Sequence, residues 1–256
     1  MIKLSLKDEF EASAEEVDAI FVNFRTLHEV YRESFHSLQD QLSDLPNAYT
    51  TKIEHAKKLF DNMANTVTAK QKSISSQLYS QAVVLLMGNA ESILESAFGM
   101  LVVNNFRKIK LPDSKNTNFS LQEVLEAKND TELGRLLLSK LEANKNPSEK
   151  LSFQNMKQLE KILSDNFSIK ISPDYIVKLH EFWQIRHVII HKQGYVDQQF
   201  LDNLAAAGIR TKKYQLYQPL KLTREEYENC FGLLVLMFDE IDKEIDRLKL
   251  DYSFPF

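Results

Sequence analysis

The sequence predicts an all-α protein, on the evidence of its turn-forming residues, its apolar spacing and its helix-start signals. Glycine and proline occur only six times each in 256 residues, whereas folds rich in β-strands need more of both for their turns. Apolar residues recur at spacings of three, four and seven, which places them on one helix face. Three segments also have the pattern of a helix capping box, in which two side chains satisfy free backbone N–H groups. These segments begin at Ser13, Ser120 and Thr223.

The first half of the chain is predicted to hold three helices. The first starts at Ser13, and its apolar face from Val17 to Leu42 is expected to pack inside the chain, with a partner helix as the alternative. Leu45-Pro46-Asn47 ends this helix. The other two helices are predicted over about residues 49–70 and 73–106.

The middle of the third predicted helix, Leu78 to Phe98, is apolar on nearly all sides. That pattern indicates burial from several directions, because a surface helix keeps one polar face. Glu91 and Glu95 interrupt the apolar surface one helical turn apart.

The second half of the chain is predicted to hold four more helices and at most one short strand. Pro173 suits the first turn of a helix that is capped by Ser172. Gly194 suits the left-handed residue that follows the end of this helix at His191. The predicted helices begin near Ser120 and cover about residues 151–166, 173–191 and 223–248, and the predicted strand covers about residues 214–222.

The composition favours a cytoplasmic protein with a helical bundle domain, residues 73–256, and an N-terminal helical extension, residues 1–72. The formal net charge is −4, whereas a general nucleic-acid coat protein would be basic. The single cysteine, Cys230, excludes an internal disulfide and is expected to be a buried thiol in a reducing compartment. The chain starts without the apolar run of a signal peptide. Its longest apolar stretch, Ala82 to Met87, is too short to span a bilayer, so no membrane partner is expected.

The segment with the most reactive side chains is Arg186-His187-Val188-Ile189-Ile190-His191. On a helix with 100° per residue, Arg186 falls in the middle of an apolar face. A guanidinium there requires a carboxylate, a carbonyl or a bound phosphate. An internal ion pair with Glu91 or Glu95 and the binding of a phosphate are therefore alternative predictions. The apolar residues of this face are Leu179, Phe182, Trp183 and Ile190.

Three of the six histidines, His180, His187 and His191, fall on a neighbouring stripe of the same helix. Histidine is the side chain best suited to proton transfer near neutral pH. His187 and His191 also have the spacing of two zinc ligands. Val188 follows His187, however, so the His-Glu-x-x-His motif is absent, and there is no cysteine pair for a structural zinc site. No metal site and no cofactor are predicted.

The segment resembles the motif of the HEPN superfamily of RNA-cleaving helical domains, which includes the MAE-type HEPN-like ribonucleases. The family motif is an arginine, a polar residue, three further residues and a histidine. Arg186, His187, Val188-Ile189-Ile190 and His191 match it at every position. As in the family, the motif ends a long predicted helix and Gly194 follows closely.

Two further features bear on this resemblance. The predicted helix over residues 73–106 resembles the first core helix of the family, in which acidic residues face inward, so Glu91 and Glu95 would be supporting residues. Lys192 departs from the family, because many relatives have asparagine directly after the motif histidine.

The resemblance implies a metal-independent endoribonuclease, in which the ribose 2′-OH attacks the adjacent phosphate. Such chemistry needs a proton acceptor, a proton donor and a cation beside the phosphorane. His191 would be the acid/base group, Arg186 would hold and neutralise the phosphate, and His187 would orient the arginine or the substrate. The residues implied in substrate binding are Lys192, Gln193 and His180.

The resemblance also implies a homodimer. Arg186 and His191 lie about 140° apart around an ideal helix, and a two-fold dimer of the family brings two motifs into one cleft. Phe182, Trp183 and Ile190 would line that interface. Basic groups within residues 107–110 and 210–213, together with Lys192, would guide RNA or be solvated loop charges.

The implied role is that of a toxin or phage-defence effector, with an antitoxin or regulatory protein subunit as a further partner. Two alternatives remain open. One is a non-catalytic HEPN module that binds RNA, a nucleotide or a protein partner. The other is a structural helical adaptor in which Arg186 is a buried ion-pair residue.

Overall fold

The computed structural model describes residues 5–20, 50–105 and 163–250 together with positions 33, 37, 127, 132, 133, 136 and 159–161, with side chains on the long helix from residue 76 onward. Over these ranges the protein is all-α, as predicted. One helix spans residues 6–20. The others are α2 (Thr50–Asn105), the π-helix η3 (Leu163–Phe167), α6 (Pro173–His191), α7 (Gln198–Ala206) and α8 (Arg224–Arg247).

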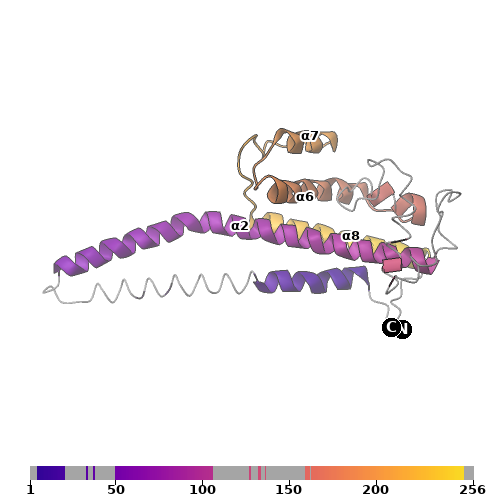
Figure 1. Cartoon of the computed structure of the whole chain (residues 1–256), viewed down its shortest axis with the longest axis horizontal. Helices are drawn as coiled ribbons and strands as arrows, with labels where there is room; N and C mark the ends of the chain where they lie inside the picture. Colours follow the sequence, from indigo (N-terminus) through magenta and orange to yellow (C-terminus); the bar gives the residue numbers. More distant parts are fainter. Residues whose placement is uncertain are drawn as a thin grey trace.

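The C-terminal half of α2 is the centre of the fold. Leu86, Leu94 and Leu101 are completely or almost completely buried in it, since α6 and α8 both pack against this helix. Figure 1 shows the helix of residues 6–20 along another side of α2 and α7 outermost on α6. The predicted burial from several directions is confirmed, and Leu85 is an exception at 47% exposed.

The segment Ser76–Asn105 of α2 is long and apolar enough to cross a membrane, by length and composition alone. In the fold it is the helix on which α6 and α8 pack, and the core helix of a soluble protein meets the same criterion. The absence of a membrane partner therefore stays a prediction.

The helix of residues 6–20 is part of the same core. Leu6, Phe10, Ala14 and Val17 recur every three or four residues and are all buried. The Phe10 ring stacks on Phe238 of α8, with 5.0 Å between centroids. Internal packing of this face is therefore confirmed for Val17, and the rest of the predicted face, up to Leu42, lies outside the described residues.

The predicted start of this helix at Ser13 is wrong, because the helix already begins near residue 6. The Ser5 hydroxyl accepts a hydrogen bond from the Asp8 N–H at 3.0 Å, which is the N-cap geometry. The Asp242 carboxylate of α8 accepts the N–H groups of Leu6 and Lys7, each at 3.0 Å. The Ser13 hydroxyl instead donates to the Phe10 carbonyl within the helix. The start is thus fixed partly by a carboxylate 236 residues away.

The two helices predicted over residues 49–70 and 73–106 form one helix, α2. The residues between the two predictions are Gln71 and Lys72, which have good helix propensity and do not interrupt it. The helix crosses the predicted boundary between residues 72 and 73 without a break, and the division into extension and domain stays a prediction.

The predicted ends of α6 and α8 are largely confirmed. Thr223 and Glu226 form the capping box of α8, in which each side chain accepts the backbone N–H of the other. Gly194 has φ +79°, and its N–H donates to the Val188 carbonyl at the end of α6. Pro173 begins α6, but the Ser172 side chain makes no cap hydrogen bond, and the Ser172 N–H donates to Glu240 of α8 at 2.8 Å.

The short strand that the sequence allows over residues 214–222 does not form. In the described part of the chain, this segment takes part in β pairing only as a single bridge between Tyr195 and Pro219. The helix α7, in contrast, was not predicted. The Asp197 side chain caps it by accepting the Phe200 N–H at 2.8 Å, and Phe200 and Leu204 are its buried residues.

The helix predicted over residues 151–166 is helical at residues 159–161 and ends in η3. Phe167 of η3 packs edge-on against Phe98 of α2 at 5.1 Å. The predicted break at Leu45-Pro46-Asn47 and the predicted helix start at Ser120 lie outside the described residues.

Replacing Asp242 by alanine is expected to destabilise the protein by about 1–2 kcal/mol, because two N–H groups at the start of the first helix lose their acceptor. Urea denaturation, followed by circular dichroism, measures this change. The matched control is Asp239→Ala on the same helix, where pairs with Lys243 and Lys7 are lost and a clearly smaller effect is expected. Equal effects for the two variants would contradict the capping role.

Candidate functional site

Arg186 lies on the face of α6 that packs against α2 and is paired there with Glu91. The Arg186 Nη2 and Glu91 Oε2 atoms are 3.2 Å apart, and the side chains are 19% and 22% exposed. The predicted ion pair with Glu91 is therefore confirmed. It joins α6 to α2 within the core, where removal from water would be costly for a lone charge.

The Arg186 side chain keeps unused hydrogen-bonding capacity. Its Nε atom is buried and has no hydrogen-bond partner among the described residues, and the same holds for the neighbouring Trp183 Nε1. Buried donors are usually satisfied by protein, water or a bound group. The guanidinium thus has both an acidic partner and an unsatisfied donor.

His187 and His191 lie together at the exposed C-terminal end of α6. Their ring centroids are 4.7 Å apart, as expected for residues one turn apart on a helix. Both side chains are exposed. In the described part of the chain Arg186 makes no direct contact with His191, so one subunit does not bring the guanidinium and this imidazole together.

The surroundings of His187 favour its neutral form. Burial lowers the pKa of His187 below its usual value of 6.5, and the charge on His191 lowers this pKa further, whereas Asp197 opposes both effects. Near neutral pH His187 is therefore an uncharged imidazole that can accept a proton or a hydrogen bond.

Lys192 is held by Asp197, with 3.4 Å between Nζ and Oδ2. The Phe200 N–H, together with Lys192, lowers the pKa of the Asp197 carboxyl below its usual range. Sequence reasoning missed Asp197, although an aspartate three residues before a buried phenylalanine is a recognisable N-cap signal. It connects the residue after the motif to the start of α7.

The remaining predicted site residues are spread along the same helix and α2. Gln193 is exposed, with φ +54°. His180 lies two turns before His187 and is partly buried, and Glu95 is partly buried one turn after Glu91. The contacts described do not join these residues to the two exposed histidines.

Part of the predicted dimer interface is wrong. Phe182 and Trp183 are 4% and 3% exposed, because they pack inside the subunit. On this face, the part of α6 that is packed against α2 ends at the Arg186–Glu91 pair. Ile190, one turn further along α6, is 46% exposed. Only Ile190 of the three is therefore available to a partner.

A second charged cluster, also missed by sequence reasoning, fixes the loop between α7 and α8. The Tyr214 hydroxyl donates to Glu181 of α6, and Lys213 pairs with Glu181 and with Glu226 of α8. Burial, followed by the bond to Glu181, raises the pKa of Tyr214 well above its usual range. Of the basic groups predicted to guide RNA, Lys213 is thus neutralised, Arg210 and Lys212 are exposed, and residues 107–110 lie outside the described ranges.

Among the described residues, no three histidine, cysteine, aspartate or glutamate side chains are grouped as a metal site requires. Cys230 is fully buried beside Met87, and burial raises the pKa of its thiol. The thiol is therefore a packing group, as predicted.

Comparisons with protein-family models, with curated proteins and with solved structures gave no match to this chain. The resemblance to the HEPN superfamily depends on the residues of the motif and their surroundings, and stays a prediction.

A double-mutant cycle measures the ion pair that positions the motif. Glu91→Gln and Arg186→Met each leave a mostly buried group without its partner. The free energy of unfolding lost in the double variant is therefore expected to be smaller than the sum of the two single losses by about 1–3 kcal/mol. Urea denaturation gives the four free energies of unfolding. The control is the same cycle on the exposed pair Arg224–Glu228, for which a clearly smaller coupling is expected. A coupling no larger than that of the control would contradict a structural role for Arg186–Glu91.

Titration of the His187 ring, followed by NMR, is expected to give a pKa below 6.5, and the variants should shift this pKa in opposite directions. His191→Ala removes a positive neighbour and should raise it, whereas Asp197→Asn removes a negative neighbour and should lower it. Because the unfolded chain binds this proton more tightly, the contribution of His187 to stability is complete above pH 6.5 and is lost as the pH falls toward the folded pKa. Shifts in the same direction would contradict the effect assigned to one of the two neighbours, and the absence of any shift would contradict both.

Proposed function

We propose that the protein is a metal-independent endoribonuclease that cleaves RNA by attack of a ribose 2′-OH on the adjacent phosphate. His191 is the acid/base group, Arg186 neutralises the phosphate and His187 orients the substrate or the arginine. In this proposal the protein belongs to the HEPN superfamily and acts in the cytoplasm as a toxin or phage-defence effector.

The observation that carries the proposal is the pair of exposed imidazoles at the end of α6, one and five residues after a guanidinium with an unsatisfied donor. Exposed histidines 4.7 Å apart can act as a proton acceptor and a proton donor, because an imidazole can fill either role near neutral pH. The arginine supplies the bidentate donor that a phosphate or phosphorane requires.

The proposal requires a second subunit. Arg186 points toward α2, whereas His191 is exposed at the helix end. A two-fold dimer through the end of α6 would bring the arginine edge of one subunit near the histidines of the other. Ile190, exposed between them in the sequence, is an apolar contact residue that suits such an interface.

Cleavage of an end-labelled RNA in EDTA tests the proposal. Wild type is expected to cut and to leave a cyclic phosphate, and His191→Ala is expected to lose about 100-fold or more in rate, which is the usual contribution of a general acid or base. The control is Lys178→Ala, an exposed residue on the same helix, which should cut at the wild-type rate. Cleavage that persists in His191→Ala, or that needs a divalent cation, would refute the mechanism.

A second candidate function is favoured by the Arg186–Glu91 pair itself. A guanidinium already neutralised by a carboxylate at 3.2 Å is less available to a phosphate, as expected for a non-catalytic module that binds RNA, a nucleotide or a protein partner. Retained RNA binding without cleavage by wild type would support this candidate in the same assay.

A further inference from the structure

The loop between α7 and α8 is fixed against the segment that directly follows the motif. The Tyr217 N–H donates to the Val196 carbonyl at 2.8 Å, and the Val196 N–H donates to the Gln218 carbonyl at 3.0 Å. The Leu220 N–H donates to the Gly194 carbonyl at 2.7 Å. Three backbone hydrogen bonds therefore attach this loop to residues 194–196, which follow His191 closely in the sequence.

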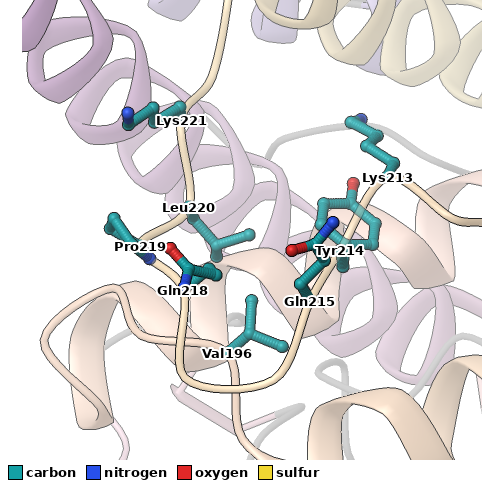
Figure 2. Close-up of a pocket in the computed structure, with 8 residues that line it drawn as sticks. All are labelled: Val196, Lys213, Tyr214, Gln215, Gln218, Pro219, Leu220 and Lys221. Carbon is teal, nitrogen blue, oxygen red and sulfur yellow. The ribbon is translucent and has the colours of Figure 1, made fainter.

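The loop borders an open pocket of about 240 Å³. Figure 2 shows Gln215 and Gln218 on opposite legs of the loop, with Val196 and Leu220 between the legs. Lys213 and Lys221 lie at the two ends of the loop and are among the residues that line the pocket, and the Lys221 side chain extends away from the space between the legs. The pocket thus combines an apolar floor, two amide groups and positive charge at its edge.

A strained turn places the two glutamines. The Gln218 N–H donates to the Gln215 carbonyl at 3.1 Å, which closes a four-residue turn. Its third residue, Tyr217, has φ +61°, a conformation in which glycine or asparagine is usual. Strain of this kind persists only where surrounding contacts impose it, and it concentrates at functional sites.

The chemistry of the lining fits one nucleobase. Each glutamine amide offers a donor and an acceptor, the combination that reads the edge of a base, and neither amide is hydrogen-bonded within the described part of the protein. The apolar floor suits a ring face. The volume is below the range of about 300–1,000 Å³ typical of sites for larger ligands, so it suits a single ring system.

The charge at the rim is supplied mainly by Lys221. Lys213 is already paired with Glu181 and Glu226, whereas Lys221 is exposed and takes part in no ion pair among the residues described. An exposed lysine beside a base-sized pocket attracts a phosphate of the same nucleotide.

We propose that this pocket receives a base of the RNA next to the cleaved phosphate, with Gln215 and Gln218 selecting the base and Lys221 attracting its phosphate. The inference depends on the proposed function for the identity of its ligand. It assigns base selection to residues outside the Arg186–His191 motif.

The test is the affinity of the full chain for fluorescent single-stranded oligo(A), oligo(C), oligo(G) and oligo(U), measured by anisotropy with the His191→Ala variant so that no RNA is cut. One homopolymer is expected to bind most tightly. Adding Gln215→Ala and Gln218→Ala should reduce its advantage over the weakest by about tenfold. Adding Lys221→Gln should weaken the binding of all four homopolymers by the same factor. It should also reduce the slope of log affinity against log salt concentration by about one, because one phosphate contact is lost.

The matched control is Gln199→Ala, an exposed glutamine on α7, which should leave all four affinities unchanged. Circular dichroism of each variant verifies the fold.

Three results would overturn the inference. They are no binding of any of the four homopolymers, equal binding of all four, and a preference that is unchanged after loss of both glutamines. Cleavage by wild type together with an unchanged preference would overturn the pocket alone. A preference that depends on the glutamines, without cleavage by wild type, would support the pocket and refute the ribonuclease.

Discussion

The fold depends on the need to cover the apolar C-terminal half of α2 on several sides. A helix with this pattern cannot leave one side to water without exposing leucine, methionine and phenylalanine side chains. Two later helices and the helix of residues 6–20 supply that cover. The position of α6 is a consequence, because its buried residues from Ile176 to Val188 are those that meet the shared core. The motif therefore lies where the packing of α2 places it.

This packing divides the motif between two environments. Arg186 belongs to the covered part of α6 and has Glu91 as its partner, while His187 and His191 extend past the cover into solvent. A charge held at the edge of a core loses little mobility when it meets a ligand, since its side chain is already ordered. The same arrangement serves stability and, under the proposed function, catalysis. It also explains why one subunit alone does not present the arginine and His191 together.

Sequence reasoning succeeded where the determining contacts are local. The ends of α6 and α8 could be predicted because Pro173, Gly194 and the Thr223–Glu226 box act within one turn of the chain. The ion pair of Arg186 could be predicted because a guanidinium on an apolar face has few acceptable partners. The predictions are wrong where the determining contact comes from a distant segment. The first helix begins after Ser5 and not at Ser13, and Asp242 of α8 accepts an N–H group at that start. Phe182 and Trp183 were assigned to a dimer interface because periodicity does not show which part of an apolar helix face is already covered within the subunit, and only Ile190 lies beyond that covered part.

The loop pocket is the part of the candidate site that was least accessible from sequence. Its walls come from backbone pairing between residues 194–196 and 217–220, and neither segment has a recognisable motif. The β-prone residues 214–222 form one bridge and a turn in place of a strand. The physical reason is that Tyr217 takes a left-handed conformation, which ends an extended segment before a ladder can form.

The contact between the helix of residues 6–20 and α8 has a consequence for biosynthesis. Phe10 packs on Phe238, and the Tyr227 hydroxyl of α8 donates to Asp18 across 209 positions of sequence. On the ribosome, the first helix emerges long before its partner is translated. The part of its apolar side that packs on α8 remains uncovered throughout that interval, which is a period of vulnerability to misassociation. Closing so distant a contact is also slow, so the synthesis of α8 determines when this part of the core can form.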